Sequence, residues 1–166
     1  MPYNNRHTTL CAWLVALCAL CLTSCEDTTF RSSVPTRPVQ LTINTAAGIY
    51  VHFVRENIGA TVVVDPEGYH FNGQTLPLTG TDYYGFAGVV IYVDNNQQYS
   101  AFDLCCPHCI KQYDHCYIDG CFAVCPVCGE QYDLSFGYAT PMKGISKEAL
   151  RKYPTFYSYP RLTVHD

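Results

Sequence analysis

Seven cysteines lie close together in this chain, and they constrain its fold more than any other sequence feature. They fall between Cys105 and Cys128, within 24 of the 166 residues. Each end of this window carries the pattern Cys-Pro-x-Cys, at residues 106–109 and 125–128. Two proline-containing turns that present cysteines at this spacing are typical of sites that hold a metal ion or an iron–sulfur cluster. The sequence therefore predicts a cysteine-rich subdomain in which two turns meet.

The N-terminus has the pattern of an export signal. Leu10–Leu22 is a run of thirteen apolar residues, shorter than the roughly 20 residues of a membrane span and typical of a secretory signal. The next residues, Leu22-Thr23-Ser24-Cys25, resemble the lipobox of bacterial lipoproteins. The resemblance implies that residues 1–24 are removed and that Cys25 carries lipid. We therefore expect a lipid-anchored protein of the cell envelope, on the periplasmic or the surface side, at the outer membrane.

From Val39 onward the chain is predicted to be β-structure. Residues 25–38 are polar and contain two prolines, which predicts a tether. Short β-prone runs separated by Gly and Pro then predict one all-β domain over residues 39–166, a small antiparallel sandwich or barrel. One helix is expected at residues 146–153. The expected strands are 39–45, 49–54, 61–64, 69–71, 89–93, 99–104, 122–124, 131–134, 156–159 and 161–164.

Two sets of ligands fit the cysteine window. The first set is Cys106, Cys109, Cys125 and Cys128, an arrangement like that of a zinc ribbon or rubredoxin. The second set contains His108 in place of Cys109. Because both sets use the same two turns, spacing alone leaves both open.

The second set and its surroundings resemble the Rieske 2Fe-2S domains, in particular Rieske-type lipoproteins of the Bacteroides group. Cys106 and His108 match the first Rieske cluster motif, and Cys125-Pro-Val-Cys-Gly-Glu-Gln-Tyr-Asp-Leu134 matches the segment around the second. The resemblance covers about residues 88–165. It implies a Rieske-like fold with a zinc-ribbon-like cluster-binding subdomain at about residues 104–134. It also implies a 2Fe-2S cluster held by Cys106, His108, Cys125 and the residue at position 128.

The chain departs from this family at Cys128, where Rieske proteins have their second histidine. Three outcomes follow. Cys128 replaces the histidine and the cluster has three cysteine ligands and one histidine ligand. Alternatively, Cys109 joins instead of His108 and the site binds zinc or iron through four cysteines. In the third outcome there is no cofactor, and these cysteines pair as disulfides, which an exported protein permits.

The sequence also predicts roles for other residues in and near the window. Cys116 and Cys121 could clamp a tight hairpin through a disulfide. The resemblance places Tyr132 near a position that hydrogen-bonds a cluster sulfur, whereas the strand pattern favours a core aromatic residue. Asp103 and Asp133 are interpreted as isolated acids at strand edges, without the paired geometry of acid–base catalysis.

The composition and the absence of certain sequence motifs exclude several classes of function. The formal charge is −4 without a basic patch, so no nucleic-acid partner is expected. There is no phosphate-binding glycine loop and no Gly-x-Ser-x-Gly motif, and no catalytic residue is expected. The resemblance implies a one-electron transfer module serving a redox partner protein, rather than a stand-alone enzyme. The alternative is a structural or interaction lipoprotein that keeps a degenerate Rieske fold with zinc or disulfides in place of the cluster.

Overall fold

The computed structural model describes residues 32–110 and 115–166, which form three antiparallel sheets and one 3-10 helix, η1 (Gly48–His52). The predicted all-β fold is confirmed. The first sheet has the order β13 (Thr155–Ser158), β14 (Arg161–His165), β1 (Val39–Asn44), β5 (Tyr83–Tyr84). The second has the order β12 (Lys152–Tyr153), β7 (Tyr99–Asp103), β6 (Val89–Val93), β2 (Thr61–Asp65), β3 (Gly68–Phe71), β4 (Gln74–Leu76). The third has the order β11 (Thr140–Lys143), β10 (Gln131–Asp133), β9 (Phe122–Val124), β8 (Tyr117–Asp119).

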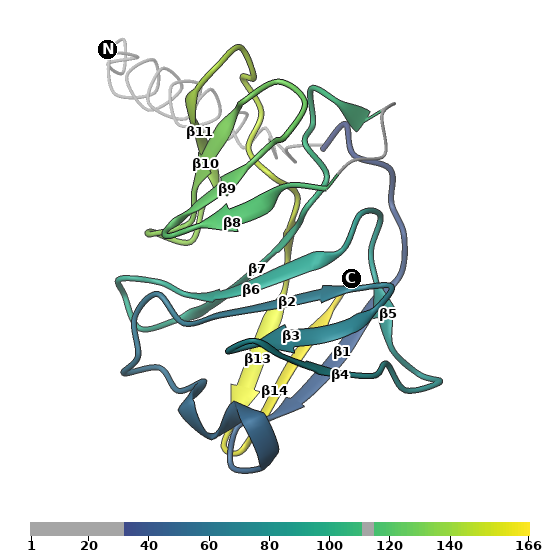
Figure 1. The fold of residues 1–166 in the computed structure, drawn as a ribbon, viewed down its shortest axis with the longest axis vertical. Helices are drawn as coiled ribbons and strands as arrows, with labels where there is room; N and C mark the ends of the chain where they lie inside the picture. The colour runs from purple at the N-terminus through teal and green to yellow at the C-terminus, as the bar shows by residue number, and fades with distance from the viewer. Residues whose placement is uncertain (1–31, 111–114) are drawn as a thin grey trace, which may run out of the picture. The chain divides into compact units, whose positions relative to one another are not determined.

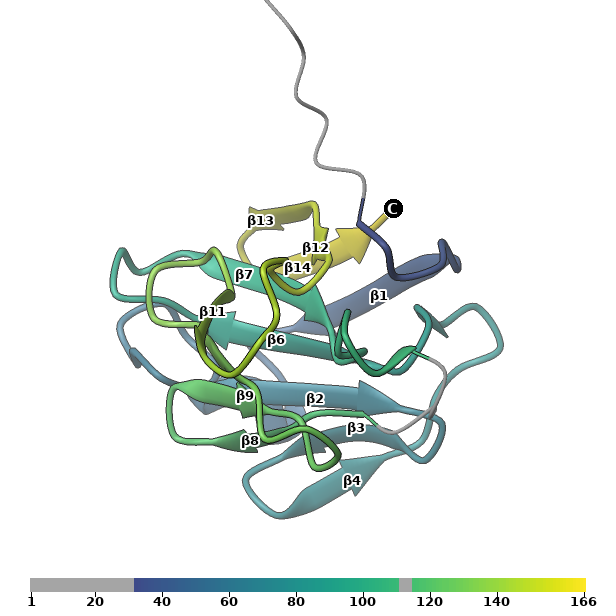
Figure 2. The same cartoon turned by 90° about the horizontal axis from the view of Figure 1, so that it is seen from above.

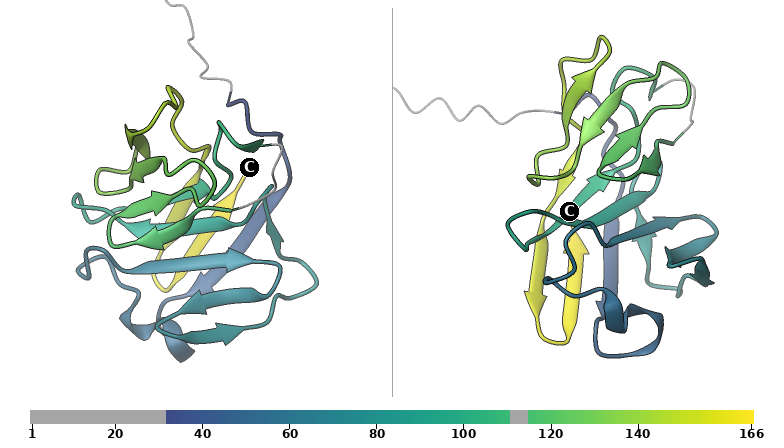
Figure 3. Two further views of the ribbon diagram at one scale, coloured as in Figure 1. Left: turned by 45° about the horizontal axis from the view of Figure 1, so that its top comes forward. Right: turned by 60° about the vertical axis from the view of Figure 1, so that its left-hand side comes forward.

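The six-stranded sheet lies in the middle of the domain (Figures 1 and 3), and its strands β6 and β7 are covered on both faces. Successive side chains of a strand point to opposite faces, and all five residues of β6 are buried. Val89, Ile91 and Val93 pack into a core shared with β1 and β14. Val90 and Tyr92 pack into a second core. The continuous apolar run of β6 is therefore explained by a strand that has no solvent face.

The second core joins the six-stranded sheet to the cysteine-rich subdomain, which is residues 104–134 together with β11. Figure 2 shows β8, β9 and β11 of this subdomain stacked over the six-stranded sheet. Phe102 and Leu104 come from the β7 side, and Tyr132 and Leu134 from the subdomain. The sulfurs belong to the same core, since Cys106, Cys109, Cys116 and Cys125 are all buried in it.

Part of the expected tether belongs to the folded domain. The compact unit begins at Ser32, ahead of the Val39 boundary expected from the sequence. Val34 is fully buried. The Ser33 backbone N–H donates to Glu148 Oε1 over 2.6 Å, and Arg151 Nη1 donates to the Val34 carbonyl oxygen over 2.8 Å. These contacts hold the start of the domain against residues 148–151.

The predicted signal peptide (residues 1–24), the lipidated Cys25 and the first part of the tether lie outside the described residues. Within residues 32–110 and 115–166, no helix is both long and apolar enough to cross a membrane.

Two local predictions were wrong. Residues 49–54 were expected as a strand but contain η1. A 3-10 helix has about three residues per turn, which directs Tyr50 and Phe53 into the same core. The helix expected at residues 146–153 is also absent from the described chain, because residues 146–151 are irregular and the last two residues, Lys152 and Tyr153, form β12, which pairs with β7. So short a helix has little stability by itself, and the pairing of β12 with β7 is therefore more favourable than a helix.

Asp103 is a hub of buried hydrogen bonds, and its interpretation as an isolated strand-edge acid was wrong. Its carboxylate is fully buried and accepts hydrogen bonds from the backbone N–H groups of Phe86 (2.8 Å), Ala87 (3.2 Å) and Cys105 (2.8 Å). The Tyr153 hydroxyl donates a fourth bond over 2.7 Å. A buried carboxylate is tolerated only with such partners. Asp103 therefore ties the 85–87 loop, the start of the cysteine window and β12 together.

We predict that Tyr153→Phe lowers the free energy of unfolding by about 1–3 kcal/mol, the contribution of a hydrogen bond to a charged group. Urea denaturation followed by circular dichroism measures the change. The matched control is Tyr159→Phe, since Tyr159 is 74% exposed and its loss of a hydroxyl should leave stability unchanged. Equal stability of the two variants would contradict the role given to the Asp103 hub.

Candidate metal centre

The first cysteine turn follows β7 and spans residues 106–109. The Cys109 N–H donates to the Cys106 carbonyl oxygen over 3.0 Å, which closes the turn. The backbone N–H groups of His108 and Cys109 face the Cys106 sulfur. Pro107 fixes its own φ near −65°, which suits a residue inside a tight turn. The chain therefore folds back so that both cysteines of the turn lie in the second core.

The second turn connects β9 to β10 and repeats this arrangement. The Gly129 N–H donates to the Cys125 carbonyl oxygen over 3.0 Å, and the Cys125 N–H donates to the Glu130 carbonyl oxygen over 2.9 Å. Gly129 has φ +71°, a left-handed conformation that favours glycine. The N–H groups of Val127 and Cys128 face the Cys125 sulfur. The repeated Cys-Pro-x-Cys pattern thus produces two similar turns.

The two turns meet so that four sulfurs form one group. The Sγ atoms of Cys106, Cys109, Cys125 and Cys128 all lie within 4.8 Å of one another. The distance between Cys106 Sγ and Cys128 Sγ is 3.8 Å. Tetrahedral zinc with Zn–S bonds of about 2.3 Å places its sulfurs about 3.8 Å apart. The spacing fits a single ion, whereas a two-iron cluster divides its four ligands between two metal atoms and spreads them further.

His108 is placed differently from these cysteines. It lies in the first turn, its side chain is exposed, and it is not a member of the four-sulfur group. Cys109, which the sequence predicted as the alternative ligand, is buried within the group. The described arrangement therefore brings together the four-cysteine set, and the set with His108 remains a prediction.

Burial and mutual proximity set the protonation of these thiols. Burial raises the pKa of Cys109, and the neighbouring thiols of Cys128 and Cys106 raise it further. Burial also raises the pKa of Cys106, against the opposing effect of the Tyr132 hydroxyl. Burial acts on Cys125 in the same direction, but the N–H groups of Cys128 and Val127, together with the side chains of Cys128 and Cys106, outweigh it and lower the pKa of Cys125. A cation is therefore needed for all the sulfurs to be thiolates together, and thiolate is the form that binds metal.

Tyr132 joins the site from β10. Its ring is fully buried in the second core, and its hydroxyl lies 3.2 Å from Cys106 Sγ. When Cys106 is a thiolate, the hydroxyl is the hydrogen-bond donor. Burial and the Cys106 sulfur both raise the pKa of Tyr132, which keeps it protonated and able to donate. Tyr132 is thus both a core aromatic residue and a hydrogen-bonding neighbour of the Cys106 sulfur.

A loop lies beside the second turn and is held by Glu130. The Glu130 side chain is buried, and its Oε2 accepts a hydrogen bond from the Ser146 N–H over 2.7 Å. A Cβ atom at Gly144 would clash with this carboxylate. Gly144 therefore allows the 144–146 loop to pack against Glu130. Glu130 lies two residues after Cys128 in the chain.

The structure does not bring Cys116 and Cys121 together. Both are free thiols. Cys116 precedes β8 and Cys121 lies in the turn after it, so the strand alone separates them by about 10 Å. A disulfide needs Cα atoms less than about 7 Å apart. Cys105, the third free thiol outside the group among the described residues, is buried, and burial raises its pKa to about 12.

Fold and site together define an antiparallel all-β domain with a four-cysteine group that could hold a metal. No protein-family model matches the chain, and no curated protein matches it.

We predict that Cys109→Ser abolishes stoichiometric metal binding whereas His108→Ser retains it, because only Cys109 belongs to the sulfur group. Elemental analysis of the purified variants measures metal per chain. Cys121→Ser, a partly exposed thiol outside the group, is the control for the loss of a cysteine. Metal lost with His108→Ser but kept with Cys109→Ser would favour the histidine-containing set.

Proposed function

We propose that this protein is a lipid-anchored domain of the cell envelope whose Cys106, Cys109, Cys125 and Cys128 thiolates hold one metal ion. The observation that carries the proposal is the sulfur spacing, with all four atoms within 4.8 Å and one pair 3.8 Å apart. The ligands complete a four-coordinate shell, as in structural zinc sites. The anchor would be lipid on Cys25, implied by the lipobox-like residues that precede it.

Zinc is the ion that this arrangement favours, and its role would be structural. The strands of the cysteine-rich subdomain have three or four residues each, and four sulfurs occupy its core. Such a small sheet gains little stability from apolar packing, and a bound metal adds its binding free energy to folding. The protein would then belong to the structural or interaction class, with a partner docking on the metal-stabilised domain.

We predict that removing the metal loosens the subdomain before the rest of the domain. Hydrogen exchange at β9 and β10 should accelerate at least about tenfold after chelation, because their turns lose the ion that joins them. Exchange at β2, in the six-stranded sheet, is the internal control and should change little. Uniform acceleration in all three strands, or none in β9 and β10, would contradict a local structural role.

One-electron transfer is the second candidate. It is supported by the resemblance to Rieske domains and by the Tyr132 hydroxyl 3.2 Å from Cys106 Sγ. Hydrogen bonds to ligand sulfurs raise the reduction potential of iron–sulfur sites. Iron in this site, or a 2Fe-2S cluster that recruits His108, would supply one-electron chemistry. A redox partner protein would then be required.

Metal content decides between the two candidates. The full chain is produced in iron-replete and in zinc-replete cells, and its metals, visible absorption and electron paramagnetic resonance signal are recorded. One zinc per chain under both conditions supports the structural role and contradicts electron transfer. Iron with absorption that bleaches on reduction supports electron transfer. Protein free of metal, with the four cysteines paired as disulfides, contradicts both.

For the iron-loaded protein we predict that Tyr132→Phe lowers the reduction potential, because a sulfur loses its hydrogen-bond donor. Redox titration monitored by absorption measures the shift. Tyr138→Phe is the control, because Tyr138 is 68% exposed. An unchanged potential in Tyr132→Phe would show that the hydroxyl does not act on the metal site.

A further inference from the structure

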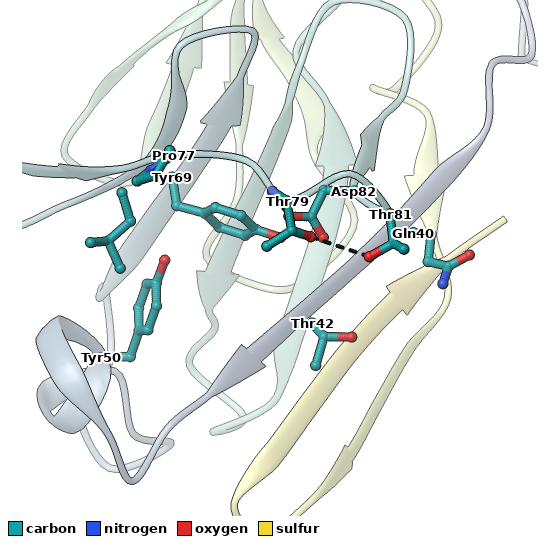
Figure 4. Close-up of a pocket in the computed structure, with 9 residues that line it drawn as sticks. Gln40, Thr42, Tyr50, Tyr69, Pro77, Thr79, Thr81 and Asp82 are labelled. Atoms are coloured by element: carbon teal, nitrogen blue, oxygen red, sulfur yellow. Dashed lines mark hydrogen bonds between the residues drawn. The ribbon is translucent and has the colours of Figure 1, made fainter.

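A polar cavity lies between β1 and the loop that follows β4, and none of the cysteines lines it. Its volume is about 280 Å³. Figure 4 shows side chains from β1, η1, β3 and the loop at residues 77–82 gathered around it. No catalytic or metal-binding prediction from the sequence involved these residues.

The inner end of this cavity contains a buried hydroxyl without a partner. Tyr69 is 5% exposed, and within the described residues no group meets the distance and angle limits of a hydrogen bond to its hydroxyl oxygen, although the Asp82 carboxylate and the Thr42 backbone lie close to it. In Figure 4 this hydroxyl points toward Asp82 and Thr79. Buried polar groups without partners are rare in folded proteins, and each one needs an explanation. A bound ligand would provide the missing partner.

Asp82 gives the cavity its charge. Its Oδ2 accepts a hydrogen bond from the Thr79 N–H over 2.7 Å, and the Tyr69 hydroxyl lies near the same carboxylate. None of the lining residues is Lys, Arg or His, and within the described ranges Asp82 forms no ion pair. Burial raises the pKa of Tyr50 to about 12, and the Asp82 carboxylate acts in the same direction on Tyr50 and on Tyr69. An anion is therefore disfavoured here.

Opposite this polar end the wall is apolar. Tyr50 and Tyr69 pack edge to face, with ring centroids 6.2 Å apart. Leu76 and Pro77 continue the wall at the mouth, where both are exposed. An apolar wall beside one carboxylate and several oxygen acceptors matches a ligand with an alkyl stem and a cationic head.

We propose that this cavity binds an alkylguanidinium or alkylammonium group, with its N–H donors on Asp82 and the Tyr69 hydroxyl and its stem against Tyr50, Leu76 and Pro77. The same chemistry is carried by a small amine and by an arginine or lysine side chain of another protein. Tetraalkylammonium ions lack N–H donors and should bind less well. Neutral alcohols and sugars lack the charge that Asp82 requires.

The test is calorimetric titration of the full chain in nonionic detergent with n-butylguanidinium and n-butylammonium. Binding to the parent chain, weakened at least about tenfold by Asp82→Asn, is the expected result. Asp82→Asn keeps a carbonyl acceptor for the Thr79 N–H, so the loop should remain folded. The matched control is Asp119→Asn, an exposed acid on β8, which should bind like the parent. Equal binding by Asp82→Asn and the parent would overturn the proposal.

Tyr69→Phe separates binding from folding. The Tyr69 hydroxyl has no partner in good hydrogen-bond geometry within the described residues and lies near the Asp82 carboxylate, so its removal should change the unfolding free energy little, while cation binding weakens. Tyr159→Phe is the control. Undiminished binding by Tyr69→Phe, or equal binding of n-butanol and methyl glucoside by the parent chain, would contradict the proposal.

The source of the cation is resolved by two further ligands. Peptides with blocked termini and a central arginine or lysine present the same head on a protein backbone. Tighter binding of such a peptide than of the free alkyl cation supports a protein partner, and the reverse order supports a small amine. Binding of neither overturns the proposal.

Discussion

The whole domain depends on one sheet whose strands β6 and β7 are buried on both faces. Because β6 has no solvent side, the domain needs material on each face of the six-stranded sheet. The first face is covered by β1 and β14, whose alternating apolar residues supply an ordinary core. The second face is covered by the cysteine-rich subdomain. The thiols are therefore part of the structure that keeps water from the centre of the domain, in addition to forming a site.

Because the thiols both cover the sheet and form a site, their protonation depends on whether a cation is bound. Sulfurs within 4.8 Å of one another cannot all be thiolates in a dry core without a compensating charge. As neutral thiols they pack as small apolar groups, and as thiolates they require a cation. Metal binding would thus change the electrostatics of the second core but need little rearrangement of its backbone, since the N–H groups of both turns already face Cys106 and Cys125.

Much of the fold follows from local pattern, and the errors have a common cause. The alternating apolar residues of β1 reflect a strand buried on one face, and the unbroken apolar run of β6 reflects a strand buried on both faces. The helix prediction for residues 146–153 failed because the last two of these residues pair with β7, a strand about fifty residues earlier in the chain that no local pattern indicates. Asp103 was misjudged for the same reason, since three of its four partners are loop or β12 groups. The repeated Cys-Pro-x-Cys spacing identified the site, but only tertiary structure distinguishes Cys109 from His108.

The docking of Val34 would limit the distance between the domain and a lipid anchor on Cys25. Val34 is buried, and the Ser33 N–H is bound to Glu148, so the described fold is held together from Ser33 onward. Seven Cα steps separate Ser32 from Cys25, which span at most about 25 Å when fully extended. With lipid on Cys25, as proposed, the domain would remain within about its own diameter of the bilayer. Any partner that it meets would then have to be in, or very near, the same membrane surface.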